Sequence, residues 1–80
     1  MAKRITICAG IDIGKWKLDV AIDGSSLQLQ VENTAEDRKV LLQWLRRHKV
    51  KRIGIEASGG YELPVVIELR RNRFVVVVFQ

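Results

Sequence analysis

The sequence predicts a small α/β domain built on a mixed five-stranded sheet, and three observations lead to this prediction. Three early segments alternate between apolar and polar residues, two later segments repeat at helical spacing, and the last segment is a continuous apolar run. Period-two alternation is typical of strands, and a 3.6-residue repeat is typical of helices. The predicted order is therefore β-β-β-α-β-α-β, with the helices packed on the sheet.

The first three segments predict an antiparallel meander. Residues 4–13, 16–22 and 27–31 each alternate, and in the first the isoleucines share one parity. Gly14 and Lys15 separate the first two segments as a turn. Asp23 and Gly24 separate the second and third, and Asp-Gly is a strong hairpin signal.

The remaining segments predict two crossover units. Thr34 followed by Asp37 resembles a capping box and begins a helix over residues 35–48. A short strand over 52–57 leads through 58–60 to a second helix, with Pro64 in its first turn and Asn72 as a left-handed cap. The apolar run 74–79 predicts a strand buried on both faces. The right-handed crossover rule makes both late strands parallel to the first.

Composition narrows the class of protein. With 80 residues, 48% of them hydrophobic, the chain has material for one small core. A single cysteine, Cys8, excludes a disulfide scaffold, and no apolar run reaches the ~18 residues of a membrane span. We expect no signal peptide, no membrane partner and a cytoplasmic location. The net charge of +5 indicates a polyanionic partner, with nucleic acid the first candidate.

A glycine-hydrophobe-acid pattern occurs twice, at the ends of two predicted strands. Gly10 precedes Asp12, and Gly54 precedes Glu56. If these strands are parallel neighbours, both carboxylates converge at the carboxyl edge of the sheet, where open α/β sheets bind ligands. Mg²⁺ takes oxygen ligands of this kind. The alternative is a turn residue and a solvated strand-end residue. Asp19 is not expected to converge with Asp12.

Other polar residues leave two interpretations open. Asp23 is assigned to the hairpin turn, and Glu62 to the start of the second helix. Residues 58–60 form either an anion cradle or a plain turn. Lys15 either contacts a phosphate or is a solvated turn residue. Four cations between the first helix and the fourth strand, together with three arginines at 70–73, form either a phosphate-binding face or a solvated surface. The four cations are Arg46, Arg47, Lys49 and Arg52.

Three stretches resemble a known family: residues 10–15 (GIDIGK), 33–34 (NT) and 56–62 (EASGGYE). They are similar to the N-terminal RuvC-like domain of DEDD insertion-sequence transposases, relatives of the pilin gene-inverting recombinase, whose fold is ribonuclease H-like. The resemblance implies DNA recombination and DNA transposition, with Asp12 and Glu56 as the first two of four catalytic acids. These acids hold Mg²⁺ or Mn²⁺ for DNA strand cleavage and transfer.

The same resemblance implies that residues 1–80 are a partial catalytic domain of a longer protein, truncated before its C-terminal helices. The last two acids and a serine-containing domain would follow Gln80. We therefore expect the fragment to be inactive and not to hold the metal stably. The family also implies DNA as a partner and a guide RNA. The apolar run 74–79 predicts a homodimer or a domain-swapped oligomer.

Two other classes of function remain open. The GIDIG wording also opens actin-like and sugar-kinase-type nucleotide-binding domains, although Thr or Ser commonly stands there where this chain has Lys15. That difference and the Gly59-Gly60-Tyr61 wording favour the transposase. The third class is a non-catalytic nucleic-acid-binding or assembly module.

Overall fold

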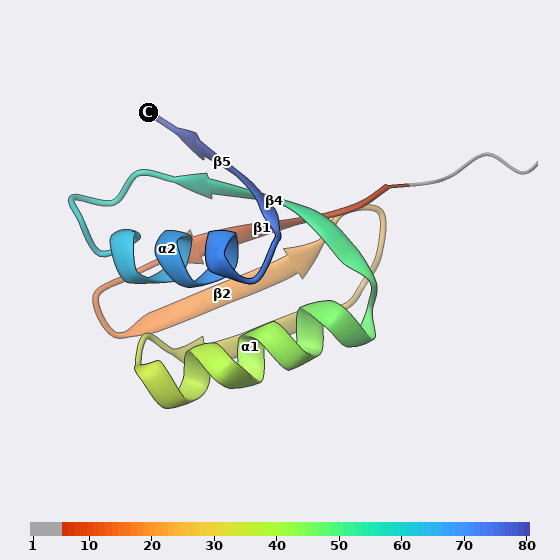
Figure 1. Cartoon of the computed structure of the whole chain (residues 1–80), viewed down its shortest axis with the longest axis horizontal. Helices are drawn as coiled ribbons and strands as arrows, with labels where there is room; N and C mark the ends of the chain where they lie inside the picture. Colours follow the sequence, from red (N-terminus) through yellow and green to blue (C-terminus); the bar gives the residue numbers. More distant parts are fainter. Residues whose placement is uncertain (1–5) are drawn as a thin grey trace, which may run out of the picture.

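A computed structural model describes residues 6–80 and shows a sheet with two helices on one of its faces (Figure 1). The predicted order of elements is confirmed. The elements are β1 (Ile7–Ile13), β2 (Lys17–Ile22), β3 (Gln28–Glu32), α1 (Ala35–Arg47), β4 (Val50–Glu56), α2 (Leu63–Arg71) and β5 (Val75–Phe79). The first two residues of the first predicted strand, 4 and 5, lie outside the described part of the chain.

The sheet is mixed, with strand order β3-β2-β1-β4-β5. β2 pairs antiparallel with both β1 and β3, which confirms the predicted meander. β4 is parallel to β1 and to β5, as the crossover rule predicts. The carboxyl ends of β1, β4 and β5 therefore meet at one edge of the sheet.

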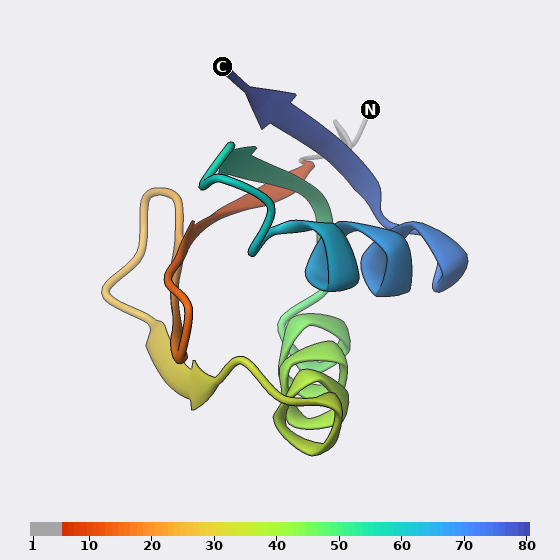
Figure 2. The ribbon, with the colours of Figure 1, turned by 90° about the vertical axis from the view of Figure 1, so that its left-hand side faces the viewer.

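The core lies between the sheet and the two helices, and alternation in the strands creates it. Every second residue of β2 and of β1 from Ala9 faces the helices, whereas in β4 the alternation begins only at Ile53, after a register shift. Leu18 and Ile55 have no exposed surface. Leu45 of α1 and Leu69 of α2 meet them from the helix layer. Figure 2 shows both helices on the same side of the twisted sheet. Each such side chain contributes about 1.5–3 kcal/mol when removed from water.

The opposite face of the sheet carries no helix within residues 6–80 (Figure 2). This corrects the expectation that the last strand is buried on both faces. Val76 of β5 faces the core, whereas Val75, Val77 and Phe79 are 53%, 48% and 54% exposed on the open face. A continuous apolar run identifies the strand but does not reveal how many of its faces are covered.

The helix ends differ in detail from the prediction. Thr34 caps α1, since its hydroxyl accepts a 3.2 Å hydrogen bond from the Asp37 N–H. The Asp37 carboxylate accepts from the N–H of Glu32 at 2.7 Å, two residues before the cap. Asn72 is not left-handed (φ −95°). The left-handed residue is the next one, Arg73, with φ 69°.

No helix in residues 6–80 has the length and apolar character needed to cross a membrane.

Candidate functional site

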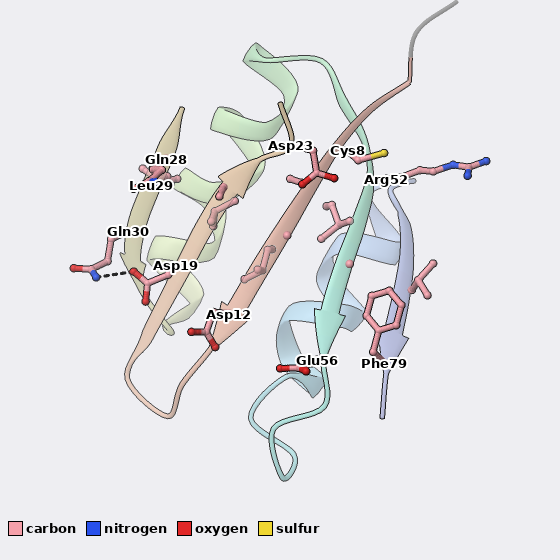
Figure 3. A pocket seen from close by; sticks show the side chains of 18 residues that line it. Cys8, Asp12, Asp19, Asp23, Gln28, Leu29, Gln30, Arg52, Glu56 and Phe79 are labelled. Carbon is pink, nitrogen blue, oxygen red and sulfur yellow. Dashed lines mark hydrogen bonds between the residues drawn. The ribbon is translucent and has the colours of Figure 1, made fainter. Parts of the chain in front are cut away.

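The two glycine-hydrophobe-acid segments lie side by side. In the parallel pairing of β1 with β4, Gly10 is opposite Gly54 and Ile11 is opposite Ile55. The next residues on the two strands are Asp12 and Glu56. Both are exposed, and Figure 3 shows both side chains on the open face at the carboxyl edge of the sheet. Within residues 6–80, both side chains are exposed to solvent.

Asp19 joins this edge, contrary to the sequence expectation. In the antiparallel pairing of β1 with β2, Asp19 is directly opposite Asp12. Gln30, its partner on β3, donates a 2.7 Å hydrogen bond from Nε2 to Asp19 Oδ1. One row across the open face therefore runs Gln30, Asp19, Asp12 and Glu56. The alternation of the sequence already indicates this position. Asp12 and Asp19 each have the parity opposite to the core residues of their strand, so both side chains lie on the open face.

The donor set fits a cation shared with a ligand better than a cation held by protein alone. In residues 6–80, no three Asp, Glu, His or Cys side chains gather closely enough to hold a metal ion. Figure 3 draws one hydrogen bond among the side chains of this face, from Gln30 to Asp19, so Asp12 and Glu56 keep free oxygens within that set. Mg²⁺ commonly uses one or two carboxylates, waters and substrate phosphates. Asp12 and Glu56 fit this pattern.

Small residues make a strip beside the acidic row. A side chain at Gly10 would meet no atom within 4 Å, so the backbone of β1 lies open to a ligand. At Gly54 a Cβ would lie 3.0 Å from Cε2 of Phe79, because the Phe79 ring lies over this glycine. The strip and the acidic row line one open hollow of about 970 Å³ on the face of the sheet.

The loop after β4 binds the chain's own carboxylate. Glu62 Oε1 accepts hydrogen bonds from the Ser58 N–H at 2.6 Å, the Ser58 hydroxyl at 3.0 Å and the Gly60 N–H at 3.1 Å. The Ser58 backbone hydrogen bond is the main reason why the pKa of Glu62 is lowered. Gly59 and Gly60 have φ of 71° and 107°, a backbone conformation that residues with a side chain rarely adopt. These donors are satisfied internally, so the interpretation of residues 58–60 as an anion cradle gives way to the plain turn.

Asn33 connects the loops that follow the two acids. Its Nδ2 donates to the carbonyl of Gly14 at 3.2 Å and to that of Tyr61 at 3.3 Å. Its Oδ1 accepts from Arg38 Nη1 at 3.2 Å, and its backbone N–H donates to the Trp16 carbonyl at 2.8 Å. The sequence pattern assigns Asn33 no role of its own. An Asn just before a helix cap is too common a turn residue to reveal such a junction.

Lys15 lies on the turn between β1 and β2, three residues after Asp12. It is exposed, and its Nζ lies 4.8 Å from the centroid of the Trp16 ring. Trp16 itself is 72% exposed. An exposed cation and an exposed aromatic ring thus lie on the turn that follows β1, and phosphate contact by Lys15 stays a prediction.

The other predicted cations do not share this edge. Arg46 and Arg47 end α1, Lys49 precedes β4, and Arg52 lies in its first half. β4 runs from Val50 to Glu56, so the start of the strand lies roughly 20 Å from Glu56 at ~3.3 Å per residue. Arg52 is nearer, about 13 Å from Glu56 on the same measure, and it lines the same hollow as the acids. The structure therefore places Arg46, Arg47 and Lys49 at the end of the sheet opposite the acidic edge, with Arg52 between the two on the open face.

Comparison with known proteins finds similarity among solved structures. No protein-family model and no curated protein matches the sequence. The chain resembles the crystal structure of the type II variant of the Aquifex aeolicus Ppx/GppA phosphatase, with 18% identity and a TM-score of 0.49. The match covers 94% of this chain, which spans only 36% of the length of the phosphatase.

This finding corrects the family resemblance drawn from the sequence. The structural neighbour is a phosphatase and not the RuvC-like domain of a DEDD transposase. The predicted role in DNA cleavage and transfer is therefore wrong, and nothing in the comparisons supports DNA recombination or an insertion sequence. Short stretches such as GIDIG occur in proteins with unrelated activities. They specify a strand, a glycine that lets a ligand approach the backbone, and an acid, but they do not specify a reaction.

Proposed function

We propose that the acidic edge binds the phosphates of a nucleotide through a divalent cation, as half of an actin-like or sugar-kinase-type nucleotide-binding domain. The register of β1 with β4 carries this proposal. It sets Gly10 opposite Gly54, with Gly10 uncovered, and places Asp12 and Glu56 at the next positions of the two strands. Such an edge offers oxygen ligands to a cation and open backbone to a phosphate.

The acidic residues and the lysine of this edge have different proposed roles. Asp12 and Glu56 would hold Mg²⁺ or Mn²⁺, because hard cations prefer carboxylate oxygen. The cation, when bound, neutralises phosphate charge and orients the phosphate group. Lys15 supplies a further positive charge within reach of the same ligand. Asp19 is held by Gln30 and keeps the row acidic without being needed as a ligand.

Other parts of the proposal concern class and location. We assign the sheet to the ribonuclease H-like topology, supported by the order β3-β2-β1-β4-β5 with only β2 antiparallel. A reduced cytoplasmic compartment is supported by the single free Cys8.

Lys15 departs from the Thr or Ser common in actin-like domains, so this chain would use an ammonium group where they use a hydroxyl. Residues 1–80 would supply one side of the nucleotide site.

Titration of the chain with ATP tests the proposal. We expect Mg²⁺-dependent binding that Asp12→Asn weakens at least about tenfold, a loss of about 1.4 kcal/mol. Asp23→Asn is the matched control, since Asp23 lines the far end of the same face and donates its N–H to the Cys8 carbonyl. This control should bind ATP like the wild type. Binding that ignores Mg²⁺, or equal affinity in Asp12→Asn, would show that the acidic edge is not the site.

A further inference from the structure

The end of the molecule opposite the acidic edge is strongly basic. Eight of the 14 Lys and Arg residues lie in two short segments, 46–52 and 70–73, which contain no Asp or Glu. All eight side chains are exposed. We call this surface the basic end; its members are Arg46, Arg47, Lys49, Lys51, Arg52, Arg70, Arg71 and Arg73.

The fold brings the two segments together. Helices α1 and α2 each lead into a parallel strand, so both helices finish at the amino edge of β4 and β5 (Figure 1). Arg46 joins them, because its Nη2 donates a 2.8 Å hydrogen bond to Asn72 Oδ1. The Arg46 guanidinium also lies 5.9 Å from the centroid of the Phe74 ring. Arg46 therefore connects the ends of α1 and α2, whereas Arg52 extends the basic end onto the open face of the sheet, where it lines the hollow.

Two of its cations occupy backbone positions that favour glycine. Lys49 and Arg73 have φ of 57° and 69°, and they are the only non-glycine residues with positive φ in residues 6–80. Each directly follows a helix C-cap, His48 or Asn72. Glycine is the usual residue at this position, because a Cβ there crowds the backbone. Both helix exits thus keep a cation at a conformational cost.

Helix stabilisation does not account for this arrangement. The last turns of α1 and α2 already hold Arg46, Arg47, Arg70 and Arg71, and the helix dipole acts only over such terminal turns. Lys51 and Arg52 lie on a strand, where no helix dipole acts. Within residues 6–80, the side-chain hydrogen bonds of these cations go to Asn72 and to the Val76 carbonyl. Neither acceptor is a carboxylate, so the charges are not neutralised.

We propose that the basic end binds the phosphate backbone of a nucleic acid duplex, independently of the acidic edge. Six of the eight cations are arginine, whose planar guanidinium matches phosphate oxygens in pairs. A duplex presents a row of phosphates that several such groups neutralise together. None of the exposed large apolar side chains lies in 46–52 or 70–73. The basic end therefore lacks the apolar side chains that a membrane-binding surface inserts among the lipids.

The double variant Lys49→Gly/Arg73→Gly separates binding from folding. It removes two charges and relieves two left-handed positions, so the unfolding temperature should stay level or rise while duplex affinity falls. Fluorescence anisotropy with a labelled duplex DNA at several salt concentrations measures the affinity. We expect the slope of log Kobs against log salt to become shallower by about 1.8, from ~0.9 per lost phosphate contact.

The control removes the same charge elsewhere. Lys17→Gln/Lys39→Gln changes two exposed lysines, on β2 and in the first half of α1, and should leave duplex affinity nearly unchanged. Asp12→Asn should also bind the duplex normally, so this proposal and the nucleotide proposal fail separately. Equal duplex affinity in the two double variants would overturn the proposal. Binding of phosphatidylserine vesicles without binding of the duplex would also overturn it.

Discussion

Glu62 is a buried carboxylate, only 8% exposed, and it organises the loop beside the proposed nucleotide site. Its lowered pKa has a definite consequence for stability. The hydrogen bonds from Ser58 and Gly60 favour the ionised form in the folded chain. The stabilisation is therefore complete above the unfolded value of 4.5 and is lost as the pH falls through the folded pKa.

Glu62→Gln should lower the unfolding temperature at pH 7, because the neutral amide accepts these hydrogen bonds less strongly. The difference from wild type should shrink as the pH falls below 4.5, where the wild-type carboxyl also becomes protonated. Thermal unfolding followed by circular dichroism across this range is the measurement. Glu36→Gln, an exposed acid in the first turn of α1, is the matched control. A Glu62→Gln deficit that is constant with pH would contradict this explanation.

At the scale of elements, Asn33 joins the β1–β2 turn, the start of α1 and the loop before α2. Asn33→Asp keeps an acceptor for Arg38 but loses both donor hydrogens and sets a carboxylate against the carbonyls of Gly14 and Tyr61. We expect a loss of about 1–3 kcal/mol in the free energy of unfolding. Urea denaturation measures it.

Hydrogen exchange gives a second readout of the same change. In Asn33→Asp the amides of residues 14–16 and 58–61 should exchange faster, while those of β1 and β4 stay protected. Gln43→Glu makes the same change from amide to carboxyl on an exposed position of α1 and should alter neither measurement. If both variants unfold at the same urea concentration, Asn33 does not hold the loops together.

The order of elements followed from the sequence because alternation and helical spacing are local properties. The parallel direction of β1 and β4 also followed, from the crossover rule, whereas their lying side by side with Gly10 opposite Gly54 was a condition of the site and not a prediction. Asp19 was misplaced because no register was worked out between β1 and β2, although parity alone puts Asp19 and Asp12 on one face. The Glu62 contacts could not be predicted, because they depend on a loop whose two glycines allow many conformations.

At the scale of the whole molecule, charge is divided along β4. The strand is preceded by Lys49, contains Lys51 and Arg52 in its first half, and ends at Glu56. The proposed nucleotide and duplex surfaces therefore lie toward opposite ends of β4, about 13 Å apart between Arg52 and Glu56 at ~3.3 Å per residue. Substitutions this far apart without shared contacts usually act additively. The two proposed surfaces can therefore be altered one at a time, which makes each single-surface variant interpretable.

β5 supplies the last feature of the whole molecule, an uncovered strand at the edge of the sheet. It contains no charge or proline, the residues that usually prevent edge pairing. Val77 is its middle residue, so antiparallel pairing of two copies about Val77 would set Val75 of one copy opposite Phe79 of the other. All three are about half exposed, and in such pairing each would contact a side chain of the second copy as a cross-strand neighbour.

The predicted homodimer can therefore be tested by one substitution. Val77→Lys places a charge at the centre of the pairing, and sedimentation equilibrium should show a monomer where the wild type forms a dimer. Val40→Lys is the matched control, since Val40 is 47% exposed on α1, and it should remain dimeric. Circular dichroism should show both variants folded, because a half-exposed strand position costs only about 1 kcal/mol. A wild type that stays monomeric at high concentration would mean that edge pairing and domain exchange are both absent, so that the exposed stripe of β5 has no second copy to cover it.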